Sequence, residues 1–200
     1  NTAIGTSALY ANTTGDKNIA IGADCLDANT TGADNTAVGA SALGSNTTAS
    51  NNTAVGKDAL EQNTTGIQNV AVGALALDAN QTGGNNVAVG YNSLSASTGD
   101  DNTGVGLNAL RKTTSGVQNT GIGNRCLEEN TTASNNTGLG YKALYGDASS
   151  SVSDYNIALG REAGELLTTG GGNLFIGNYA GEDVTTGSNN VVLKATSTNY

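Results

Sequence analysis

The chain has 200 residues, a formal net charge of −9 and no His, and its eight Lys and Arg residues are scattered. Binding of nucleic acid requires clustered basic side chains, so the composition argues against a nucleic-acid partner. No apolar run approaches the roughly 20 residues of a membrane-spanning helix, and no signal-peptide pattern opens the chain. With no Met and a first residue that already starts a repeat, the sequence is expected to be an excerpt of a longer protein.

A unit of seventeen residues recurs along the chain, as in NTAVGKDALEQNTTGIQ at residues 52–68. The units begin with Asn at residues 1, 18, 35, 52, 69, 86, 102, 119, 136, 156, 173 and 190. A fixed short period indicates a repeat architecture, in which stacking collects the few large apolar residues into one continuous strip. The sequence therefore predicts one elongated repetitive domain over residues 1–193, with residues 194–200 starting a linker to another module.

Numbered from its first Asn, each unit opens with a short alternating stretch at positions 2–4, which predicts a β-strand. Position 4 is always aliphatic, and we expect it to line the interior, as at Ile4, Val38, Val55 and Val72. The Ala-Leu pair at positions 8 and 9 suggests a second strand with its Leu inside. The expected interior Leu residues are Leu9, Leu43, Leu60 and Leu77.

Two corners separate the expected strands. Gly at position 5 marks one corner, where a positive φ or a close backbone approach is wanted. The other corner is Asn-Thr-Thr-Gly, whose residues tolerate left-handed conformations and satisfy turn backbone groups. The fold class is therefore all-β, a parallel β-solenoid of about twelve coils, and stacking at about 4.8 Å per coil gives a rod roughly 55 Å long.

Some units depart from the pattern. The unit at 86–101 is one residue short at Ser97-Thr98-Gly99, and the unit at 136–155 is three residues longer, with a polar insertion at 146–151. Both changes fall at the same corner, where insertions leave the stack undisturbed. The units from residues 156 and 173 replace Ala-Leu by Ala-Gly, and Leu166-Leu167, Val184 and Phe175 are expected to compensate.

The third position of the unit is almost always Ala or Gly. Since side chains alternate across a strand, this column faces opposite to position 4. If position 4 lines the interior, a surface kept this small is one approached closely by a second copy of the chain. The rival assignment places the Ala column inside a narrow coil and the aliphatic column between subunits. On the first assignment the candidate subunit contacts are Ala37, Ala54, Ala71, Ala88, Gly104 and Gly121.

The motifs NTAIG, NIAIG, NTAVG and NVAVG, each followed after two residues by a small residue and Leu or its equivalent, resemble the head repeats of trimeric autotransporter adhesins. Units such as NTAVGKDALEQNTTG and NLFIGNYAGEDVTTG resemble still more closely the repeats of phage tail-fibre proteins and bacterial tail-fibre-domain proteins. The resemblance covers almost all of residues 1–193, although adhesin heads use shorter units. It implies a left-handed parallel β-roll assembled as a homotrimer, serving as a fibre shaft or adhesive head on a virion or cell surface.

Candidate chemical sites are few. Cys25 and Cys126 share position 8 but lie six coils apart, roughly 29 Å at the strand spacing, so they cannot form an intrachain disulfide and are interpreted as small buried apolar residues. Eight Asn-X-Ser/Thr sequons are present, and because their period is that of the corner, we interpret most of them as turn residues. The acidic corner at Asp100-Asp101 is interpreted as a solvated surface. No cofactor, metal or catalytic residue is predicted.

Three functions compete. The favoured one is a non-enzymatic structural or adhesive segment of an extracellular trimeric fibre, with any host-surface glycan or receptor bound by adjoining domains. The second is an ice-binding solenoid with a threonine ladder formed by Thr13-Thr14, Thr30-Thr31, Thr47-Thr48 and Thr64-Thr65. The third is part of a polysaccharide-binding or cleaving tailspike, because paired carboxylates occur at Glu128-Glu129 and Glu182-Asp183. These pairs are sequence neighbours on an expected exposed corner, without the facing geometry of a glycoside hydrolase.

Overall fold

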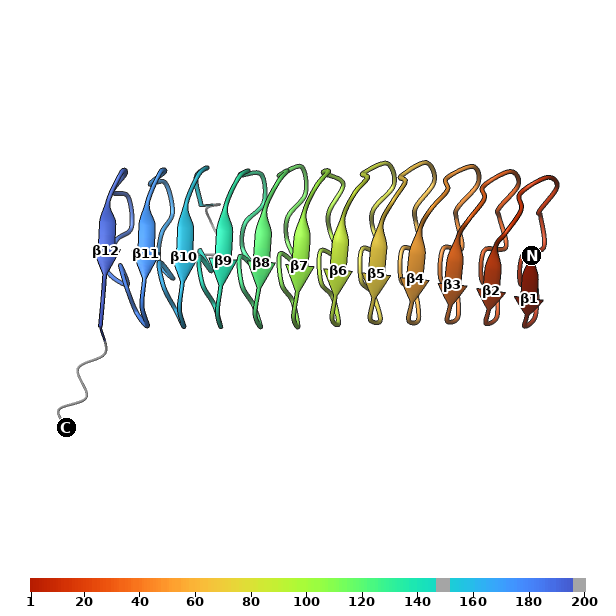
Figure 1. The fold of residues 1–200 in the computed structure, drawn as a ribbon, viewed down its shortest axis with the longest axis horizontal. Helices are drawn as coiled ribbons and strands as arrows, with labels where there is room; N and C mark the ends of the chain where they lie inside the picture. Colours follow the sequence, from red (N-terminus) through yellow and green to blue (C-terminus); the bar gives the residue numbers. More distant parts are fainter. Residues whose placement is uncertain (147–151, 196–200) are drawn as a thin grey trace, which may run out of the picture.

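A computed structural model describes residues 1–146 and 152–195 as a stack of coils, each contributing one short strand (Figure 1). The strands form a single parallel sheet in chain order, from one end of the rod to the other. No helix occurs among the described residues. The strands are Thr2–Ile4 (β1), Ile19–Ile21 (β2), Thr36–Val38 (β3), Thr53–Val55 (β4), Val70–Val72 (β5), Val87–Val89 (β6), Thr103–Val105 (β7), Thr120–Ile122 (β8), Thr137–Leu139 (β9), Ile157–Leu159 (β10), Leu174–Ile176 (β11) and Val191–Leu193 (β12).

The strands pair in the register of the sequence repeat. In β4, Ala54 lies opposite Ala37 of β3 and Ala71 of β5. The same register holds across the short unit, where Ala88 of β6 pairs with Gly104 of β7. The predicted all-β parallel solenoid is thus confirmed, although each unit contributes one strand, and the deletion in the short unit is absorbed at the corner. The insertion predicted in the long unit lies mostly outside the described residues.

The predicted second strand is wrong. Positions 7 and 9 adopt left-handed conformations, for example φ 56° at Asp58 and 52° at Leu60, so the Ala-Leu stretch is a turn. It still bonds between coils, since the Leu60 amide donates to the carbonyl of Ala76 at 3.0 Å. A left-handed Leu costs about 1–2 kcal/mol. Burying the same side chain stabilises the fold by about 1.5–3 kcal/mol, so burial offsets the strain.

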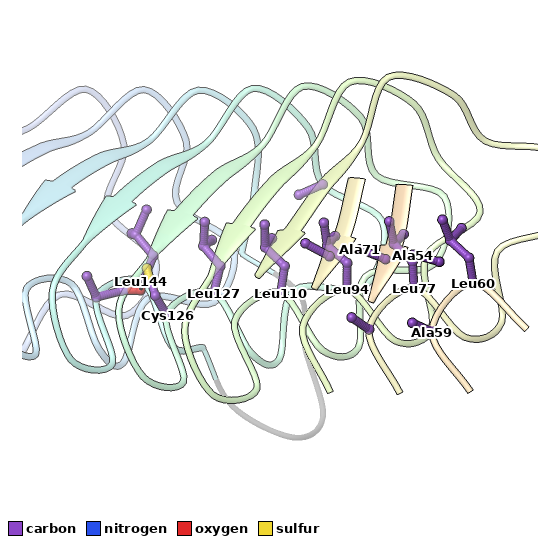
Figure 2. Packing of buried hydrophobic residues seen from close by; sticks show 14 of the residues in the cluster. Ala54, Ala59, Leu60, Ala71, Leu77, Leu94, Leu110, Cys126, Leu127 and Leu144 are labelled. Atoms are coloured by element: carbon purple, nitrogen blue, oxygen red, sulfur yellow. Dashed lines mark hydrogen bonds between the residues drawn. The ribbon is translucent and has the colours of Figure 1, made fainter. Parts of the chain in front are cut away.

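The interior of the rod is a narrow column of Ala and Leu side chains (Figure 2). Leu43, Leu60 and Leu77 are fully buried as predicted, and Leu9 in the first coil packs against the same core while half-buried. The third position supplies the other wall, with Ala54 and its equivalents fully buried. A Cβ added at Gly121 would lie 3.1 Å from Cγ of Leu110, so this wall has room only for Ala or Gly.

The prediction that position 4 lines the interior is therefore wrong. Ile4, Val55 and Val72 are exposed, and Val38 is partly exposed, because all four point outward from the sheet. A strand with apolar groups on both faces does not reveal which one is inside. The narrow interior selects the smaller residue, so the structure places the Ala column inside the coil, as the rival assignment did.

The glycine corner is present as predicted, and Gly39 shows both reasons for it. Its φ is +142°, and a Cβ added to it would lie 2.3 Å from the carbonyl oxygen of Gly56 in the next coil. Only Gly permits this conformation and this approach.

Asn side chains at position 12 form a buried ladder along the opposite corner, which we call the turn-Asn ladder: Asn12, Asn29, Asn46, Asn63 and Asn80. In each internal step one amide NH₂ donates twice. For Asn63, Nδ2 donates to Oδ1 of Asn46 at 3.1 Å and to the carbonyl of Gly66 at 3.0 Å. The ladder satisfies polar groups that stacking removes from water.

Candidate assembly face

The strand face is the surface formed by the outward side chains at positions 2 and 4 of all twelve strands. Position 4 holds only Ile, Val and Leu, and position 2 holds Thr, Ile, Val or Leu; no charged residue occurs in either column. The strands lie side by side in chain order (Figure 1). Because they also pair in register, each column runs along the rod. Its only polar side chains are the Thr hydroxyls at position 2; neither column holds a carboxylate, amine, imidazole or thiol.

Aliphatic side chains along this face are exposed through the whole length of the rod. Ile21 near one end, Ile122 in the middle and Ile176 near the other end are 37%, 38% and 38% exposed. Scattered exposed aliphatic residues are ordinary on protein surfaces, but a contiguous apolar patch of this kind marks an interaction site. The strand face is therefore the candidate functional surface.

The subunit contacts predicted from the small-residue column are wrong. Each of those residues lies inside its own coil and is fully buried within a single chain, so none can contact a partner. They are Ala37, Ala54, Ala71, Ala88, Gly104 and Gly121. The absence of charge from positions 2 and 4 is the sequence signal that points to the strand face as the candidate surface instead.

The paired glutamates of the tailspike hypothesis are buried, which corrects the expectation of an exposed corner. Glu128 is 1% exposed and accepts Nε of Arg111 at 2.8 Å and Nε of Arg125 at 2.5 Å. Glu129 is 5% exposed and accepts Nζ of Lys112 at 2.5 Å. Both carboxylates are engaged in ion pairs, mostly between coils, which gives them a structural explanation. Glu182 likewise pairs with Lys194, at 2.9 Å.

The two threonines of each pair in the ice-binding hypothesis differ in what their hydroxyl groups do. The first Thr of each pair bonds the next coil: Oγ1 of Thr13 donates to the carbonyl of Thr30 at 2.9 Å, and Oγ1 of Thr64 donates to Gln81 at 3.0 Å. The second Thr of each pair, such as Thr14 or Thr65, is exposed, whereas the first is partly buried except in the first coil, where Thr13 is exposed. A single column of exposed hydroxyls does not make the two-dimensional array that the hypothesis requires.

Most of the sequons belong to the turn-Asn ladder or its equivalent. Asn29, Asn46, Asn63, Asn80 and Asn130 are fully buried, and Asn12 in the first coil is half-buried. The exposed sequon Asn is Asn51, which has φ 63°, while Asn135 at the same repeat position is partly buried. The interpretation of these residues as corner chemistry is supported by their buried hydrogen bonds.

The cysteines behave as buried apolar residues, and each Sγ donates to a backbone carbonyl. Burial raises the pKa of the Cys25 thiol to about 11 and that of the Cys126 thiol to about 12. At the acidic corner, Oδ1 of Asp100 accepts the amide of Gly84 at 2.8 Å.

Among residues 1–146 and 152–195, no group of three or more His, Cys, Asp or Glu side chains is arranged to hold a metal ion. The same part of the chain contains no helix that is long and apolar enough to cross a membrane.

Comparison of the chain with protein-family models, with curated proteins and with solved structures found no match.

Proposed function

We propose that this chain is a structural or adhesive segment of an extracellular homotrimeric fibre, such as a phage tail fibre or a cell-surface adhesin, in which the strand faces of three copies pack together. One observation carries the proposal: two columns of uncharged side chains, one of them wholly aliphatic, are exposed or partly exposed along twelve consecutive strands of a chain whose net charge is −9. A surface required only to contact water would carry Lys, Glu or Gln at some of these positions.

A second copy of this chain fits the face better than an unrelated partner. Every copy presents the same columns with the same rise per coil, so side chains of one copy remain in register with those of another along the whole rod. Such a contact between identical copies grows with every coil, and repeated around the rod it closes into a symmetric ring of subunits. The number three and the left-handed sense come from the resemblance to tail-fibre and adhesin repeats.

The structural role also explains the distribution of polar chemistry. Buried Asn, Thr and Glu side chains are engaged in bonds within or between coils, as at Asn52, whose Nδ2 donates to the Gly66 carbonyl at 2.9 Å. The inter-coil network gives a stiff rod. We propose that host recognition, if this segment belongs to a receptor-binding fibre, resides in adjoining domains.

The test is the mass of the particle in solution, measured by sedimentation equilibrium on the purified segment. We expect three chains per particle. Val72→Glu places a carboxylate on the strand face and should dissociate the assembly, whereas Thr65→Glu, on the exposed corner, should leave it intact.

Ala71→Glu tests the small-residue column at position 3, which is the contact surface that the sequence first suggested. Because Ala71 is fully buried in its own coil, the substitution should unfold the chain instead of yielding folded monomers. A wild-type segment that sediments as a stable, folded monomer would contradict the proposal.

A further inference from the structure

The turn-Asn ladder ends abruptly between two coils. In the short unit, position 12 is occupied by Ser97 instead of Asn. Both Ser97 and Asn80, its neighbour in the preceding coil, are fully buried. Within the described part of the chain, Oδ1 of Asn80 and Oγ of Ser97 are among the few buried side-chain atoms without a hydrogen-bond partner. Leaving such groups unsatisfied costs about 1–3 kcal/mol each.

The carbonyl oxygen of Gly99, next to Asn80 and Ser97, accepts one side-chain amide fewer than its equivalents in the regular coils. In the regular coils the position-15 carbonyl accepts two side-chain amides: Gly32 accepts Nδ2 of Asn18 at 2.8 Å and Nδ2 of Asn29 at 3.0 Å. In the short coil the equivalent carbonyl belongs to Gly99, and it accepts Nδ2 of Asn86 at 2.8 Å. Ser97 has no amide to supply the second bond.

The neighbouring coils show where the NH₂ group of an Asn at position 12 would lie. A Cβ built on Gly66 would meet Oδ1 of Asn63 at 2.5 Å and Nδ2 of Asn80 at 2.9 Å. A Cβ built on Gly83, one coil later, would meet Oδ1 of Asn80 and the carbonyl oxygen of Gly99, each at 2.6 Å, and the carbonyl oxygen of Thr98 at 2.9 Å. Three acceptors therefore surround one point, and two of them, Oδ1 of Asn80 and the Gly99 carbonyl, are the atoms to which the amide of a position-12 Asn would donate.

We infer that a single water molecule is bound at this step, between Asn80, Ser97 and Gly99, and replaces the missing NH₂ group of the ladder. Its two hydrogens donate to Oδ1 of Asn80 and to the carbonyl of Gly99. Its oxygen accepts the hydroxyl hydrogen of Ser97. A buried water typically makes about three hydrogen bonds to groups that are otherwise unsatisfied, which is the number available here. The inference concerns the interior of one chain and is independent of the proposed assembly.

The direct test is a crystal structure of the wild-type segment at a resolution that shows ordered waters. We expect density for one water within hydrogen-bond distance of Asn80 Oδ1, Gly99 O and Ser97 Oγ. An interior without that density, or one in which Ser97 Oγ bonds Asn80 Oδ1 directly, would overturn the inference.

A matched pair of variants adds a second readout. In Ser97→Asn the amide should displace the water and extend the ladder by one step. In Asn63→Ser, made in a regular coil of full length, a water should appear between Asn46 Oδ1 and the carbonyl of Gly66. A folded Asn63→Ser variant without a water at this place would contradict the inference that a water replaces the missing NH₂ group.

Discussion

The ring of Phe175 occupies the space left by the missing side chain of Gly164 in the preceding coil. A Cβ added to Gly164 would lie 2.7 Å from Cδ2 of the ring. In the regular coils the sizes are reversed, as where a Cβ on Gly121 would face Cγ of Leu110 at 3.1 Å. Near the C-terminal end of the rod, a large residue at position 3 and a small one at position 9 thus fill the same interior volume.

This relationship predicts that two substitutions compensate each other. Phe175→Ala alone should destabilise the fold by about 3–5 kcal/mol because it leaves a cavity. Gly164→Leu alone should also destabilise it, since the new side chain overlaps the ring. The double variant restores the regular combination of Ala and Leu, and should melt above either single variant. Gly164 has φ +61°, close to the φ 49° of Leu144, so the backbone accepts Leu. Additive losses in thermal unfolding would contradict the proposed exchange.

The central core is tested by Leu60, which is fully buried between its equivalents in the adjacent coils. Leu60→Ala should lower the free energy of unfolding by about 2–5 kcal/mol. Gln62→Ala, at an exposed position of the same coil, should change it by less than about 0.5 kcal/mol. Denaturant unfolding of the two variants measures the difference, and equal losses would show that the described register is wrong.

The buried ion pairs should contribute more to the free energy of unfolding than the exposed ones. Glu128→Gln weakens two charge-assisted bonds, to Arg111 and Arg125, and should cost about 1.5–3 kcal/mol. Glu182→Gln removes a pair in which Glu182 and Lys194 are 44% and 42% exposed, and should cost less than about 1 kcal/mol. Thermal unfolding at low and at high salt separates the cases, because salt screens the exposed pair more strongly. A larger loss at Glu182 would contradict the assignment.

Asp78 provides a pH-dependent prediction. Burial raises the pKa of this carboxyl, and the nearby charges of Glu61 and Asp58 raise it further, while backbone hydrogen bonds oppose the shift. A carboxyl whose folded-state pKa lies above its unfolded value binds more protons when folded, so stability falls as the pH rises through the folded pKa. Asp78→Asn removes this loss and should raise the melting temperature at neutral pH.

The gain at Asp78 should vanish on acidification to about pH 3, below the ordinary pKa of Asp. Asp183→Asn, at an exposed position, removes the same charge and serves as the control for net charge. A gain that persists at low pH, or one that the control reproduces, would show that burial of Asp78 is not its cause.

Much of the fold follows from periodicity alone. A unit repeated in register must place equivalent residues above one another, so the stacking of Leu60 between Leu43 and Leu77 and the glycine corner at Gly39 could be predicted. The corner chemistry of Asn29 and Asn63 could also be predicted, because its period is that of the unit. Periodicity does not predict the conformation of a single coil. If one repeat position is assigned to the wrong face, the same assignment is wrong in every coil, so the repeat itself does not reveal the mistake.

Tertiary structure decided which side of each strand is inside. Thr53-Ala54-Val55 offers an apolar residue on both faces, and only the width of the interior, narrowed by the left-handed turn at Leu60, assigns Ala54 to the core and Val55 to the surface. The turn itself could not be predicted from the sequence, because a buried Leu in a left-handed conformation gives the same apolar pattern as a buried Leu in a strand. Sequence thus determined that the coils stack and which residues share a column. The steric fit between Ala and Leu sets the cross-section of the coil. That cross-section decided which column is buried and which is exposed on the surface.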